Sequence, residues 1–86
     1  GDEFVIVMPG TGLRGGVEIA ERIRAAVASD GFAMALGSHP IAVTVSAGLA
    51  ESDGDSSAAL LRRADRALYR SKQDGRNRVS VDRARD

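Results

Sequence analysis

The chain has 86 residues and a mass of 9.0 kDa, which corresponds to one small domain or to part of one. Its apolar share of 43% indicates a folded segment, whereas an aromatic share of 3% argues against stacking on unpaired nucleic-acid bases. The absence of cysteine excludes disulfides, thiolate zinc sites and cysteine nucleophiles, and no apolar run approaches the roughly 20 residues that span a bilayer.

The first two expected elements are a buried strand and an amphipathic helix. A short, nearly continuous apolar run from Phe4 to Met8 ends at Pro9 and predicts the strand. The glycine-rich segment 11–16 is expected to be a turn. From Val17 onward, apolar residues recur every three to four positions, which predicts a helix that ends near Gly31.

A β-hairpin is expected next. Residues 32–36 form a short strand candidate, and residues 37–40 form a turn. Residues 41–50 then alternate between a mainly large, aliphatic row that begins at Ile41 and a small row that begins at Ala42, which predicts a strand over residues 41–49 with two unlike faces. The small face would allow a helix or a ligand to approach the backbone closely.

The last expected elements are a second helix and a short closing strand. The helix runs from Ala58 to about Asp74, after a polar loop that ends in capping residues, and Gly75 is a natural C-terminal cap. Residues 79–81 predict the strand, and residues 82–86 predict a charged, frayed tail. The inward residues expected on the second helix are Leu60, Leu61, Ala64, Ala67 and Leu68.

A net charge of zero hides a separation of charge along the chain. Residues 1–59 contain three arginines and eight acidic residues, whereas residues 60–78 contain seven basic residues and two acidic ones. This distribution suits a site that holds a metal on one side and phosphates on the other. The alternative is a helix with a solvated arginine face, formed by the stripe Arg62, Arg66 and Arg70.

Two groups of residues could carry chemistry. Asp2 and Glu3 follow Gly1 directly before the first strand, and their carboxylate oxygens suit a hard divalent cation, although a plain turn is the alternative. Lys72, which is the one lysine in the chain, and Arg76 lie four residues apart at a helix end and could clamp phosphate oxygens. The alternative for this pair is that both cations interact only with the helix dipole.

Four segments, in the same order, resemble the GGDEF family of diguanylate cyclases. Together they are distributed over almost all of residues 1–81. They are the signature and strand of residues 1–9, the helix segment 20–24, the strand segment 43–48, and a late segment in two parts, 64–72 and 75–79. Several motifs in the same order are more specific than any one of them alone.

The resemblance implies an α+β fold, the palm-like, ferredoxin-like αβ sandwich of nucleotidyl cyclases. Residues 1–81 would be the C-terminal half of that domain. The implied activity is that of a bacterial signalling transferase that condenses two GTP molecules into cyclic di-GMP and releases two pyrophosphates. Two such domains would face each other as a homodimer, each with one GTP bound. The implied location is cytoplasmic, whether or not the whole protein is anchored to a membrane.

The resemblance also implies roles for individual residues. Asp2 would be a catalytic metal ligand that helps to activate the attacking hydroxyl, and Glu3 would be the second acidic position. Magnesium or manganese would be the metal. Gly1 would lie against the nucleotide, and Lys72 and Arg76 would bind the terminal phosphates of GTP.

The sequence departs from the family pattern at its start. Only one of the two signature glycines is present, as Gly1. A further metal aspartate, the guanine-binding residues and the inhibitory RxxD motif are expected upstream, together with a sensor domain. Arg22 would assist that inhibitory site. Because half of the metal site would be missing, residues 1–86 alone are expected to be inactive.

Two other functions remain open at this stage. One is a non-catalytic module that binds GTP or cyclic di-GMP and regulates a neighbouring domain, although the intact signature of residues 1–4 argues against degeneration. The other is a nucleic-acid binder that uses the arginine stripe. Zero net charge and few aromatic residues disfavour that function, so neither nucleic acid nor membrane is expected as a partner of this segment.

Overall fold

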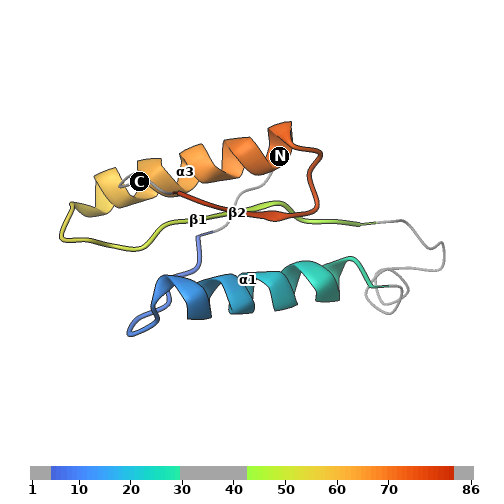
Figure 1. The fold of residues 1–86 in the computed structure, drawn as a ribbon, viewed down its shortest axis with the longest axis horizontal. Helices are drawn as coiled ribbons and strands as arrows, with labels where there is room; N and C mark the ends of the chain where they lie inside the picture. Colours follow the sequence, from blue (N-terminus) through green and yellow to red (C-terminus); the bar gives the residue numbers. More distant parts are fainter. Residues whose placement is uncertain (1–4, 30–42, 83–86) are drawn as a thin grey trace.

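The computed structural model describes residues 5–29 and 43–82. These residues form helix α1 (Leu13–Val27), strand β1 (Ala47–Leu49), helix α3 (Ser57–Gln73) and strand β2 (Val79–Val81). The two strands lie side by side in one layer, with α1 on one side and α3 on the other (Figure 1). The α+β class expected from the sequence is therefore confirmed for the described part of the chain.

Strands β1 and β2 are parallel, and α3 is the crossover that joins them. Ala47 pairs with Val79, and Leu49 pairs with Val81. The ladder continues past β2, since the N–H of Asp82 donates to the carbonyl of Leu49 at 2.8 Å. Parallel neighbours need a long connection, and a helix satisfies its own backbone hydrogen bonds along the way.

The alternation predicted for residues 41–50 is confirmed in β1, because its two faces meet different helices. Gly48 faces α3 so closely that an added Cβ would lie 2.1 Å from the backbone nitrogen of Leu68 and 2.3 Å from the carbonyl oxygen of Ala64. Leu49 faces α1, with a methyl carbon 3.2 Å from where a Cβ on Gly16 would lie. The small residue thus allows the close approach of a helix, as the pattern indicates.

Helix α3 begins and ends within one residue of the prediction. The hydroxyl of Ser56 accepts a hydrogen bond from the N–H of Ala59 at 3.1 Å and caps the first turn. At the other end Gly75 has a φ of +114°, and the N–H of Arg76 donates to the carbonyl of Ser71 at 2.9 Å. This pattern is a Schellman motif, which ends a helix with glycine in the left-handed region.

The predicted burial of the second helix is correct in part. Ala67 is fully buried, whereas Leu61 is exposed because it lies at the margin of the apolar arc. Ser71 is also fully buried, which the pattern does not predict. Its hydroxyl lies 2.8 Å from the carbonyl oxygen of Ala47 and 2.6 Å from the hydroxyl of Ser80, so both strands are tied to α3.

Two predictions for the first third of the chain are wrong. Helix α1 begins at Leu13, so Gly15 and Gly16 lie in the helix rather than in a turn. Gly16 is buried against Leu49, and its lack of a side chain therefore serves packing instead of a turn. Ile23 belongs to the apolar series that begins at Val17, yet it is exposed, so the apolar face of α1 is not fully covered.

The buried strand expected at residues 4–8 is not formed in the part that the structure describes. Val5, Ile6 and Val7 are 69%, 59% and 78% exposed, and no strand is assigned to residues 5–8. A strand needs a hydrogen-bonded neighbour, and within the described ranges β1 and β2 pair only with each other. The expected strand at residues 32–36 and its turn at residues 37–40 lie outside the described residues.

Two further findings concern the length of β1 and the character of the helices. The strand expected at residues 41–49 is assigned only at its last three described positions, Ala47–Leu49. Neither described helix is both long enough and apolar enough to cross a bilayer.

Candidate functional site

The loop that follows α3, residues 75–77, has an unusual backbone and is called the cap loop below. Gly75, Arg76 and Asn77 have φ angles of +114°, +66° and +48°, so all three lie in the left-handed region. For a residue other than glycine this region costs roughly 1–2 kcal/mol, although asparagine tolerates it better than most. Two consecutive non-glycine residues in this region persist only where contacts hold them.

Contacts from three elements hold the cap loop. The Schellman hydrogen bond ties Arg76 to the end of α3. The N–H of Asn77 donates to the hydroxyl of Ser46, directly before β1, at 3.1 Å. The side-chain oxygen of Asn77 accepts a hydrogen bond from Nη1 of Arg24, on α1, at 2.8 Å. The loop is therefore fixed by both helices and by the residue that precedes the first strand.

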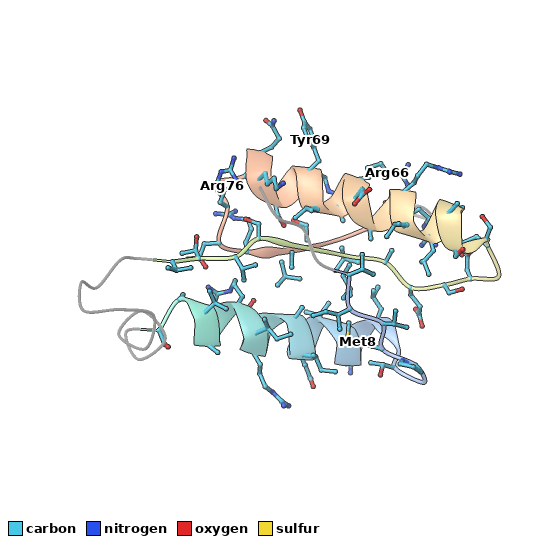
Figure 2. The ribbon with its side chains drawn as sticks, turned by 180° about the vertical axis from the view of Figure 1, so that it is seen from behind. Met8, Arg66, Tyr69 and Arg76 are labelled. Atoms are coloured by element: carbon cyan, nitrogen blue, oxygen red, sulfur yellow. The ribbon has the colours of Figure 1, made fainter. Side chains whose placement is uncertain are left out.

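Two of the predicted site residues lie at this end of the molecule. Lys72 is in the last turn of α3, and Arg76 lies just beyond it in the cap loop, where the chain leaves the helix (Figure 2). Arg76 is exposed and Lys72 is half-buried. Two cations at a helix C-terminus oppose the negative end of the helix dipole, so an anion can approach there without electrostatic repulsion from the helix.

The other predicted site residues are not brought into this arrangement by the described structure. Gly1, Asp2 and Glu3 lie outside the described residues. In residues 5–29 and 43–82 no group of three metal-ligating side chains is close enough to hold an ion. Arg22 is exposed on α1. The roles expected of these residues stay predictions.

A second polar cluster, which the sequence pattern does not predict, centres on Arg63. Its Nε donates to Oδ2 of Asp82 at 2.9 Å, and its Nη1 donates to Oδ2 of Asp55 at 3.0 Å. Nη1 also donates to the carbonyl oxygen of Glu51 at 3.0 Å. Arg66 adds Nε and Nη2 to Oδ1 of Asp82, at 3.1 and 3.0 Å.

This cluster corrects two expectations. The side chain of Asp82 is 2% exposed, so the residue belongs to the packed structure and not to a frayed tail. The stripe of arginines does not simply face solvent either, because Arg66 binds Asp82 and Arg70 donates to the carbonyl of Val81. Both contacts join residues far apart in the sequence, and local periodicity carries no signal for them.

The cluster around Arg63 has a structural role. The hydrogen bond from Arg63 is the main cause that lowers the pKa of Asp82, and Arg63 likewise lowers the pKa of Asp55. Every buried side-chain nitrogen and oxygen among the described residues has a hydrogen-bond partner. The buried groups of the cluster are paired with one another, so the cluster clamps α3 to the end of β2.

Comparison with known proteins agrees with the family resemblance seen in the sequence. A family model described as diguanylate cyclase, GGDEF domain, matches residues 1–78. The chain is 44% identical over 81 residues to the response regulator PleD of Caulobacter vibrioides, covering 92% of this chain and 18% of the relative. It is 42% identical over 82 residues to the diguanylate cyclase DgcP of Pseudomonas aeruginosa, covering 94% and 12%.

A third relative extends the comparison to another organism. The diguanylate cyclase DgcM of Escherichia coli K12 is 44% identical over 80 residues, covering 92% of this chain and 18% of the relative. The chain thus spans less than a fifth of the length of each of these curated relatives. No solved structure gives a significant match.

Proposed function

Because this chain belongs to the GGDEF family, we propose that it is part of a diguanylate cyclase that condenses two GTP molecules into cyclic di-GMP and two pyrophosphates. The family match over residues 1–78 carries this proposal. Relatives from two organisms that are named diguanylate cyclases support it. Residues 1–81 would form the C-terminal half of the palm-like domain.

The acidic pair at the start of the chain is proposed as the metal-binding part of the site. Asp2 and Glu3 offer carboxylate oxygens, which are the donors that magnesium and manganese prefer. A divalent cation bound there would offset negative charge on the phosphate oxygens of the substrate. Asp2 would also help to activate the attacking 3′-hydroxyl, and Gly1 would allow the nucleotide to lie close to the backbone.

The cationic pair at the end of α3 is proposed as the phosphate-binding part of the site. The guanidinium of Arg76 can bind two phosphate oxygens at once, and the ammonium of Lys72 adds a compact positive charge. Their positions on either side of the helix C-terminus support this role. Negative charge on the triphosphate would otherwise be repelled by the exposed carbonyls of the last turn.

The reaction requires a second copy of the domain, since each domain would hold one GTP and the two must face each other. The proposed partners are therefore GTP, a second GGDEF domain, the first half of the domain and an upstream sensor domain. Arg22 is exposed on α1 and would contribute to a product-inhibition site together with an upstream RxxD motif. The alternative function is a non-catalytic module that binds GTP or cyclic di-GMP.

Replacing Asp2 by alanine in the complete protein tests the proposed activity. Cyclic di-GMP formation should fall below detection, because loss of a metal carboxylate removes several kcal/mol of transition-state stabilisation. Glu18 is an exposed acidic residue of α1, and the matched control Glu18→Ala should keep full activity. Circular dichroism should show both variants folded.

The outcomes separate the two candidate functions. Near-normal turnover by Asp2→Ala would contradict the metal assignment. A wild-type protein that binds GTP in calorimetry but forms no cyclic di-GMP would instead favour the non-catalytic module.

A further inference from the structure

Arg24 connects α1 to the cap loop and has no role in the proposed site. Its Nη1 donates to the side-chain oxygen of Asn77, 53 residues away in the sequence, at 2.8 Å. Its Nε donates to the carboxylate of Glu21, one helical turn earlier, at 2.8 Å. The side chain of Arg24 is 20% exposed, so it is partly shielded from water.

The pairing with Glu21 makes Arg24 a rigid connector. A guanidinium is planar and offers several donors in a fixed arrangement, so binding on one side restricts the direction of the other. Glu21 occupies Nε and leaves Nη1 directed at Asn77. The hydrogen bond that Arg24 donates is also the main cause of the lowered pKa of Glu21, so this carboxylate stays charged.

Asn77 is the residue through which this connector reaches the cap loop. It has a φ of +48°, and it directly follows Arg76, whose φ is +66°. Its N–H and its side-chain oxygen are both engaged, by Ser46 and Arg24. Unfavourable backbone conformations that neighbouring contacts hold in place are concentrated at functional sites.

We propose that Arg24 is a positioning residue: through Asn77 it fixes the cap loop, and so the direction in which Arg76 meets the terminal phosphates of GTP. This inference rests on the proposed function, and adds to it a residue on a different helix that does not itself touch substrate. Without Arg24 the loop keeps its bonds to Ser71 and Ser46 but loses its attachment to α1. Arg76 would then be ordered only when GTP binds, and affinity would fall by that ordering cost.

A double-mutant cycle in the complete protein tests the inference. The probe is 3′-deoxy-GTP with magnesium, which lacks the attacking hydroxyl and cannot be condensed, and its affinity is measured by calorimetry. We expect Arg24→Ala to weaken binding by about tenfold, within the usual range for coupled neighbouring residues. In the Arg76→Ala background, Arg24→Ala should have no further effect.

Two matched variants separate positioning from simple loss of charge. Arg14→Ala removes an exposed arginine from the same helix and should leave the affinity unchanged. Asn77→Gly keeps the left-handed backbone accessible and removes no charge, yet it deletes the acceptor for Arg24. It should weaken binding as much as Arg24→Ala does, and it serves as the test if Arg24→Ala fails to fold.

The outcomes distinguish this inference from the proposed function. Equal weakening by Arg24→Ala with and without Arg76 would overturn the inference, because Arg24 would then act on the ligand by another route. Wild-type affinity in Asn77→Gly would also overturn it, and would leave the proposed function intact. Wild-type affinity in Arg76→Ala would overturn both the inference and the proposed role of Arg76.

Discussion

Replacing Gly48 with alanine would place a methyl group inside the backbone of α3. The added carbon would lie 2.1 Å from the nitrogen of Leu68, 2.3 Å from the carbonyl oxygen of Ala64 and 2.6 Å from the Cα of Leu68. Contacts under 3.0 Å require something to shift. All three neighbours are backbone atoms, so no side-chain rotation can relieve them.

The size of the effect follows from this geometry. To restore ordinary contact, α3 would have to retreat from β1 by about 1 Å or more, which would reduce close packing along their shared face. Overpacked cores typically lose about 1–3 kcal/mol, and rigid backbone neighbours put Gly48→Ala at the upper end. About 3 kcal/mol makes local opening of the β1–α3–β2 unit more frequent by a factor on the order of a hundred.

Hydrogen–deuterium exchange of the α3 amides in the complete protein measures this opening. Gly15→Ala is the matched control: its added carbon would lie 3.2 Å from a methyl group of Thr11, which is a side chain and can move. Because Gly15 lies within α1, alanine should stabilise the helix by about 0.5–1 kcal/mol. Unchanged protection of α3 in Gly48→Ala would refute the close packing described here.

Three other predictions concern the two ends of α3 and the exposed apolar residues 5–7. Lys72→Ala and Arg76→Ala should each weaken the binding of 3′-deoxy-GTP. Arg62 is an exposed arginine of the same helix, and Arg62→Ala should leave the affinity unchanged. Equal affinities of all three variants in calorimetry would contradict the proposed site. The pKa of Asp82 is lowered from its usual 3.8, so its carboxylate stabilises the fold above that value and stability is lost as pH falls through the lowered pKa. The free energy of unfolding should therefore fall less steeply with decreasing pH in Asp82→Asn than in the unchanged protein. Asp55 and Glu21, whose pKa values are also lowered, contribute to the remaining loss of stability in acid. Residues 1–86 alone should associate in light scattering because Val5, Ile6 and Val7 are exposed, and should make no cyclic di-GMP; a monomer with a sharp thermal transition would contradict the association.

The elements that were predictable from the sequence are those with strong local signals. Helix α3 has a serine cap, a regular apolar arc and a glycine just after its C-cap residue; both caps agree with the structure, and the arc agrees except at Leu61. The small face of β1 is also predictable from a local signal, since alternation alone places Gly48 and Leu49 on opposite faces of the strand. Such agreement between local preference and tertiary contact is what makes a segment predictable.

The features that were not predictable depend on contacts between distant residues. Glycines at positions 15 and 16 favour a turn by local preference, yet packing against Leu49 draws Gly16 into α1. The apolar run at residues 5–8 has the composition of a buried strand, but burial also requires a neighbouring strand. The bonds from Arg63 to Asp82 and from Arg24 to Asn77 span 19 and 53 residues, so no motif of fixed spacing predicts them.

The candidate site is predictable mainly through its resemblance to a family. Spacing alone leaves Lys72 and Arg76 as ordinary cations at a helix end, and only the resemblance carried by several motifs in order predicts a phosphate-binding role for them. The sequence signals the left-handed region only at Gly75, and it does not predict that Arg76 and Asn77 also adopt it.

The identity of the product formed from GTP is the decisive test of the proposed cyclase activity. The complete protein is incubated with GTP and magnesium, and the nucleotide products and released pyrophosphate are quantified by chromatography and mass spectrometry. The proposed function predicts cyclic di-GMP with two pyrophosphates released for each molecule formed, because each of two GTP molecules loses one. Intact GTP, or its conversion to GDP and inorganic phosphate, would contradict it.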